Sequence, residues 1–117
     1  MRAVSIEQWE LLLFFEVEPE FYEPNDVWPY TTACYRVQQG EISLEFSIYP
    51  ACRDIQIILE VQGNCFYELG ALEIEDVRYF KNAEREILEI SLTKCDRLLL
   101  QVRPNIKIWQ EIAAEIS

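Results

Sequence analysis

Residues 42–61 read ISLEFSIYPACRDIQIILEV, two runs of alternating apolar and polar residues on either side of a short connection. The apolar positions within each run lie two residues apart, and they are Ile42, Leu44, Phe46, Ile48, Ile55, Ile57, Leu59 and Val61. Because successive side chains of a strand point to opposite faces, each run places four apolar side chains on one face. The pattern predicts an antiparallel pair of strands at the centre of a half-buried sheet, with these eight side chains largely buried.

Similar alternation flanks this pair on both sides. It predicts further strands, separated by short polar turns, at 32–38, 65–69, 71–80, 88–92 and 98–102. Six or seven strands joined in this way form an antiparallel meander, so we expect a mainly β fold, with α+β as the alternative. The apolar face must be covered, either by curling of the sheet into a sandwich or barrel or by a helix packed across it. The length fits a single domain over residues 1–117.

The two ends of the chain carry helical patterns. Ser5-Ile6-Glu7-Gln8 has the form of a capping box, which predicts a helix over 5–14. Its expected buried stripe has helical spacing and consists of Ile6, Trp9, Leu12 and Leu13. Residues 11–15 could instead form a buried strand. Near the C-terminus, the spacing of apolar residues over 106–116 predicts a short helix, and an edge strand through Ile106 and Ile108 is the alternative.

The chain carries a net charge of −11, and this charge is uneven. Residues 1–35 hold seven acidic side chains against Arg2, so the first third carries more than half of the net charge. Such a charge repels phosphate, which argues against nucleic acid or an anionic membrane as the partner. It is either a device for solubility or a surface that attracts a basic protein. No apolar run approaches a membrane span and no signal peptide is recognisable, so we expect a cytoplasmic protein.

The residue types limit the available chemistry. The chain has no histidine, and its four cysteines, Cys34, Cys52, Cys65 and Cys95, are too far apart for zinc knuckles. We therefore expect core thiols, no metal and no cofactor. A carboxylate site is the remaining possibility for an enzyme, because acids alternate at Glu16, Glu18 and Glu20 and again at Glu73 and Glu75.

The longest expected loop covers residues 19–30, which read PEFYEPNDVWPY. Proline restricts the backbone here, and long loops inside compact domains are often functional. Large aromatic rings with polar handles are common in binding hot spots, and acids surround them in this loop. The candidate partner-binding residues are Glu20, Tyr22, Glu23, Asp26, Trp28 and Tyr30. The alternative is a loop that folds over one end of the core and only caps it.

These features favour a non-catalytic acidic interaction protein that binds a basic protein surface. Antitoxin-like and immunity-type inhibitors of nucleases work by this logic, because their carboxylates occupy the place where the enzyme expects phosphate. The alternative is a small carboxylate-based enzyme or a ligand-binding module. Pairing of two copies through an exposed sheet edge would give a homodimer.

Overall fold

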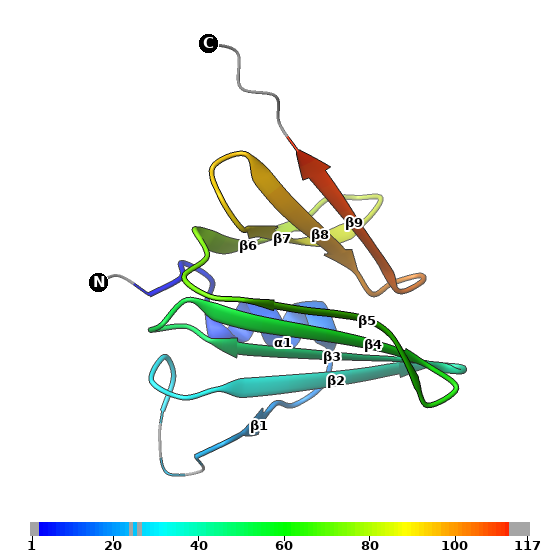
Figure 1. Cartoon of the computed structure of the whole chain (residues 1–117), viewed down its shortest axis with the longest axis horizontal. Coiled ribbons are helices and arrows are strands. Elements are labelled where there is room, and N and C mark those ends of the chain that lie inside the picture. Colours follow the sequence, from blue (N-terminus) through cyan, green and yellow to red (C-terminus); the bar gives the residue numbers. More distant parts are fainter. Residues whose placement is uncertain (1–2, 24, 26, 113–117) are drawn as a thin grey trace.

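The computed structural model describes residues 3–23, 25 and 27–112. Two antiparallel sheets pack face to face, and one short helix lies at their side (Figure 1). The helix α1 is Gln8–Phe15, and the first sheet contains β1 (Glu20–Phe21), β2 (Ala33–Gln39), β3 (Ile42–Tyr49), β4 (Asp54–Val61) and β5 (Asn64–Ala71). The second sheet contains β6 (Asp76–Lys81), β7 (Glu86–Ser91), β8 (Asp96–Gln101) and β9 (Lys107–Ile112).

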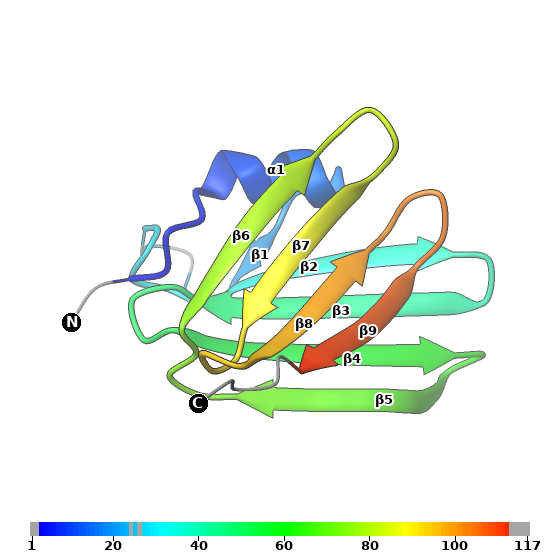
Figure 2. The ribbon, with the colours of Figure 1, turned by 90° about the horizontal axis from the view of Figure 1, so that it is seen from above.

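The mainly β class, the antiparallel meander and the N-terminal helix are confirmed. Strands follow one another in chain order within each sheet, β1 to β5 and then β6 to β9, so the fold is two consecutive meanders stacked as a sandwich. The strands of one sheet cross those of the other at an angle (Figure 2). The described residues form nine strands, more than the six or seven expected, because β1 lies in the predicted loop 19–30 and β9 takes the edge-strand alternative for the C-terminal segment. Residues 113–117 of the predicted C-terminal helix lie outside the described residues.

The central hairpin has the predicted register. Leu44 pairs with Leu59, Phe46 with Ile57 and Ile48 with Ile55 across β3 and β4. Five of the eight apolar positions are fully buried, namely Leu44, Phe46, Ile48, Ile55 and Ile57. Across the sandwich, the second sheet contributes Val77, Leu88, Ile90, Leu98 and Leu100 to the same core.

The other three positions of the hairpin, Ile42, Leu59 and Val61, are only half-buried, which corrects the expectation for them. They lie toward the ends of β3 and β4 that project beyond the second sheet (Figure 2). The polar face also has an exception, because Ser47 is 5% exposed, opposite Cys34 on β2. The predicted register is therefore right. Alternation could not show, however, which parts of each face the second sheet covers.

The helix α1 begins later than expected and buries a different face. Its N-cap is Glu7, whose backbone N–H donates to Glu10 Oε1 at 2.9 Å, whereas Ser5 lies outside the helix. The buried side chains are Leu11, Phe14 and Phe15, which also have helical spacing. The predicted stripe is wrong for its members on the helix, since Trp9, Leu12 and Leu13 are exposed.

The helix closes the open side between the two sheets. It contacts β2, β6 and β7, and the ring of Phe15 lies 5.1 Å from that of Tyr35 and 5.4 Å from that of Phe46. Leu11, Phe14 and Phe15 of the helix therefore close the core on this side. Arg103 fixes the end of the helix, because its guanidinium donates to the Leu13 carbonyl at 3.1 Å and pairs with Glu16 at 2.8 Å.

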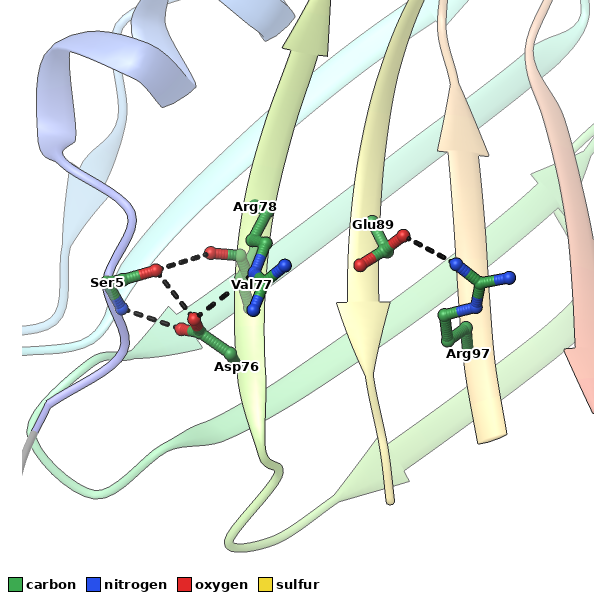
Figure 3. A network of polar contacts seen from close by, with 6 residues as sticks. All are labelled: Ser5, Asp76, Val77, Arg78, Glu89 and Arg97. Carbon is green, nitrogen blue, oxygen red and sulfur yellow. Dashed lines mark hydrogen bonds and ion pairs between the residues drawn. The ribbon is translucent and has the colours of Figure 1, made fainter. Parts of the chain in front are cut away.

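The segment before the helix is fastened to the second sheet. Ser5 donates its backbone N–H to Asp76 Oδ1 at 2.7 Å and its hydroxyl to Oδ2 at 2.6 Å (Figure 3). Burial opposes ionisation of Asp76, but the hydrogen bonds from Ser5 and the Val77 N–H, with the charge of Arg78, outweigh it and hold the pKa of Asp76 below its usual value. Figure 3 also shows Glu89 paired with Arg97 on the neighbouring strands β7 and β8, at 3.0 Å.

Candidate partner-binding surface

The predicted loop residues occupy different surroundings. Glu20 lies on β1, and its carboxylate is 2.7 Å from the guanidinium of Arg36 on β2, so a neighbouring base balances part of its charge. Glu23 is exposed, and Asp26 lies outside the described residues. Of the three acids expected to surround the aromatic rings, the structure therefore describes two, Glu20 and Glu23.

The aromatic rings of the loop do not form one cluster. Tyr22 and Tyr30 are 61% and 64% exposed, whereas Trp28 is half-buried and packs against the core. Tyr22 lines a hollow of about 330 Å³ together with Ser47 and Gly70 of the first sheet, and Trp28 lines a separate groove. Trp28 therefore helps to cover the core, as the capping alternative expects, whereas the two tyrosines project into solvent and partner binding by this loop stays a prediction.

The groove beside Trp28 has a volume of about 480 Å³, and we call it the α1 groove. It lies where α1, the chain leading out of that helix, and the loop before β2 meet. Its main lining side chains are Glu7, Trp9, Leu12, Glu18, Trp28 and Tyr35. Two indole rings and two carboxylates therefore face the same groove, and among its described lining residues none is basic.

Tyr35 is the least ordinary member of this groove. The residue is 0% exposed, and among the described residues its hydroxyl has no hydrogen-bond partner. Its ring stacks on that of Phe15, with an angle of 18° between the ring planes. Burial raises the pKa of Tyr35 well above its usual value, and the nearby Glu18 carboxylate adds to this rise. The side chain therefore stays neutral and presents an unused hydroxyl beside a carboxylate.

The acids considered for a carboxylate enzyme are not arranged as the sequence suggested. Glu16 ends α1 in the left-handed conformation, with φ of 58°, and pairs with Arg103, so it shares no strand face with Glu18 and Glu20. Glu73 is also left-handed, with φ of 53°, in the segment that crosses from β5 to β6. The described part of the chain contains no group of three or more acidic or cysteine side chains that could hold a metal ion.

The cysteines differ from the expected set of core thiols. Cys34 is buried, and its thiol donates to Glu45 Oε1 at 3.3 Å; burial raises the pKa of this thiol. Cys95 is half-buried, but Cys52 and Cys65 are exposed, so the expectation is wrong for these two. They lie in the β3–β4 connection and near the start of β5, next to turns, where alternation no longer indicates which face is covered.

Trp9 and Leu12 were missed by reasoning from the sequence. They were assigned to a buried stripe because they fit helical spacing with Ile6, but Leu11, Phe14 and Phe15 fit it equally well. Periodicity alone cannot choose between two apolar stripes on one helix. The sequence carries no signal that separates the two stripes, because both combine leucine with aromatic rings.

Among solved structures, the chain is similar to one chain of a contact-dependent growth inhibition toxin–immunity protein complex from Klebsiella pneumoniae 342. The TM-score is 0.79 at 21% sequence identity, and the match covers 95% of this chain and 98% of that chain. At this identity the likeness establishes a shared fold. No protein-family model matches the chain, and no curated protein does. The described residues include no helix long and apolar enough to cross a membrane.

Proposed function

We propose that this chain is a non-catalytic immunity-type inhibitor that binds a basic surface of a partner toxin. The observation that carries the proposal is the fold it shares, over nearly its whole length, with one chain of a toxin–immunity protein complex. Such a complex contains two kinds of protein, a toxin and the protein that neutralises it. The shared fold does not decide which of the two roles this chain has, and its charge and composition favour the immunity role.

The charge of the chain supports the immunity role. A net charge of −11 suits a protein that binds a basic surface, because complementary fields accelerate encounter and reject other partners. The exposed rings of Tyr22 and Tyr30 and the α1 groove lie in or beside the acidic first third. A surface that combines carboxylates with aromatic side chains is typical of tight protein recognition.

The enzyme alternative receives no specific support. The sequence lacks histidine, and the acids at 16, 18 and 20 diverge toward Arg103, the α1 groove and Arg36 respectively. A carboxylate enzyme needs two acids on opposite sides of one scissile bond. The expected cytoplasmic location and the homodimer through a sheet edge stay predictions; the edge strands are β1 and β5 of the first sheet and β6 and β9 of the second.

The proposal is tested by capture followed by a protection assay. The tagged chain is used to capture proteins from its native host, and each basic protein identified by mass spectrometry is expressed from an inducible promoter. We expect one of them to arrest growth alone and to be harmless when this chain is co-expressed. If every captured protein is harmless, or if growth arrest persists at equal levels of this chain, the immunity role is wrong.

A further inference from the structure

We propose that the α1 groove binds an arginine side chain of the partner protein, with the guanidinium over the indole rings and hydrogen-bonded to Tyr35 and Glu18. This inference rests on the proposed function for the identity of the partner. To the proposed function it adds the site on this chain that binds the partner and the chemical group of the partner that this site recognises. The same groove is open to a direct test without the partner.

The hydroxyl of Tyr35 is the first argument. A polar side chain at 0% exposure without a hydrogen-bond partner is uncommon, since nearly all buried polar groups in proteins are satisfied. The hydroxyl oxygen accepts hydrogen bonds, so a donor would satisfy it once the side chains that cover it in the groove move aside. Glu18 lines the same groove, and its charge contributes to the raised pKa of Tyr35, so a donor group with several N–H bonds is suited to serve both oxygens.

The two indole rings are the second argument. Trp9 is 60% exposed on α1 and Trp28 is half-buried in the loop, and both line the groove. Tryptophan is the best aromatic partner for a cation above its ring, and arginine is found there more often than lysine. A planar guanidinium also stacks on an aromatic face and presents five N–H donors in a fork, which an ammonium group cannot do.

The charge of the groove is the third argument. Glu7 and Glu18 line it, and within the described part of the chain no ion pair involves either carboxylate. Arg103 lies at the end of α1, and it is already held by Glu16 and Glu86 at 2.8 Å each. The groove thus combines two acids without an ion pair among the described residues, two indoles and an unused hydroxyl, although Glu7 also takes part in the capping box of α1. This set matches one arginine side chain better than an apolar or an anionic group.

The direct test uses N-acetyl-arginine amide as the probe in an NMR titration of the full chain. The indole N–H resonances of Trp9 and Trp28 should shift as the probe binds, and that of Trp109 should not. Trp109 is a suitable internal reference because it lies on β9, at the far edge of the second sheet from α1 (Figure 2). N-acetyl-citrulline amide, which has the same shape without the charge, should leave all three resonances in place.

Variants assign the binding to individual groups. Glu18→Gln and Tyr35→Phe should each lower the affinity for the arginine probe about threefold or more. Glu68→Gln, at an exposed position of β5, should leave this affinity unchanged. Trp9→Ala on the solvent face of the helix should abolish the shift at Trp28. The proposal is overturned if citrulline or lysine amide binds as tightly as arginine amide, or if Glu68→Gln weakens binding as much as Glu18→Gln does.

The partner arm separates this inference from the proposed function. With a toxin identified by the protection assay, Trp9→Ala should raise the dissociation rate about tenfold or more, because an aromatic anchor holds the complex after encounter. If the toxin binds Trp9→Ala and Glu18→Gln as tightly as the wild type, the groove assignment fails and the immunity role stands. If no toxin is found, the immunity role fails, and the probe titration still decides whether the groove binds arginine.

Discussion

At the scale of single residues, the buried hydroxyl of Tyr35 lowers the stability of the fold, because it has no hydrogen-bond partner among the described residues. Desolvation without a compensating hydrogen bond disfavours the folded state by about 1–3 kcal/mol. Tyr35→Phe removes the oxygen and keeps the ring that stacks on Phe15. We therefore expect the free energy of unfolding to rise by about 1 kcal/mol or more, measured by urea denaturation. A fall would mean that the hydroxyl is already hydrogen-bonded in the free protein and has no need of a donor from a ligand.

Leu44 tests the core of the hairpin. It is 1% exposed and pairs with Leu59 across β3 and β4. Leu44→Ala should lower the free energy of unfolding by about 2–5 kcal/mol, because it removes buried methyl groups and leaves a cavity between the sheets. Ile42→Val on the same strand is the control and should cost less than about 1.5 kcal/mol, since Ile42 is half-buried. An equal loss of unfolding free energy in the two variants would contradict the finding that Leu44 is buried and Ile42 only half-buried.

At the scale of elements, the Ser5–Asp76 contact fastens the chain before α1 to β6. The pKa of Asp76 is lowered in the folded state. Its ionised form therefore contributes stability that is fully present above the unfolded pKa of about 3.9 and is lost as the pH falls through the folded pKa.

Asp76→Asn should accordingly lower the free energy of unfolding at pH 7 by about 1–3 kcal/mol. This deficit should shrink as the pH falls below about 4, where the wild type loses the same contribution. Urea denaturation at pH 7 and at pH 3 measures both values. Glu68→Gln, on an exposed position of β5, is the matched control. A deficit that stays constant between the two pH values would show that the carboxylate acts by packing and not by its charge.

The elements differ in how far the sequence could predict them. Alternation predicted β2, β3, β4, β5, β7 and β8, although their cover differs: no side chain of β5 is fully buried, whereas four consecutive residues of β7 are. It could not identify β1, which has two residues, and for β9 a helical spacing of apolar residues competed with an edge strand. The buried face of α1 was wrong because two apolar stripes share one short helix, and only contacts with β2, β6 and β7 select between them.

The candidate site shows the same limit. Trp28 is a candidate because of its loop, whereas Trp9 and Glu18, which line the same groove, come from other segments of the chain. The unused hydroxyl of Tyr35 could not be expected either, since Tyr35 sits in a predicted strand and its surroundings depend on α1. A groove formed by three separate segments is a property of packing, and no single segment predicts it.

At the scale of the whole molecule, the two meanders place the acidic first third along one side of the sandwich. Helix α1 and β1 both come from this third, and they lie on the same side of the molecule (Figure 2). The net charge of −11 and the position of these acids together form the physical basis of the proposed function. Exposed charges act at a distance only when salt does not screen them, over about 8 Å at physiological ionic strength.

The association rate with the captured toxin, measured as a function of salt concentration, tests this account most directly. We predict a steep fall with rising salt for the wild type. The triple variant Glu20→Gln/Glu23→Gln/Asp26→Asn should associate more slowly and with a flatter dependence. The control Glu60→Gln/Glu68→Gln/Glu84→Gln, with the same change in net charge, should behave like the wild type. Equal rates and slopes for both triple variants would contradict a partner-binding surface in the first third of the chain.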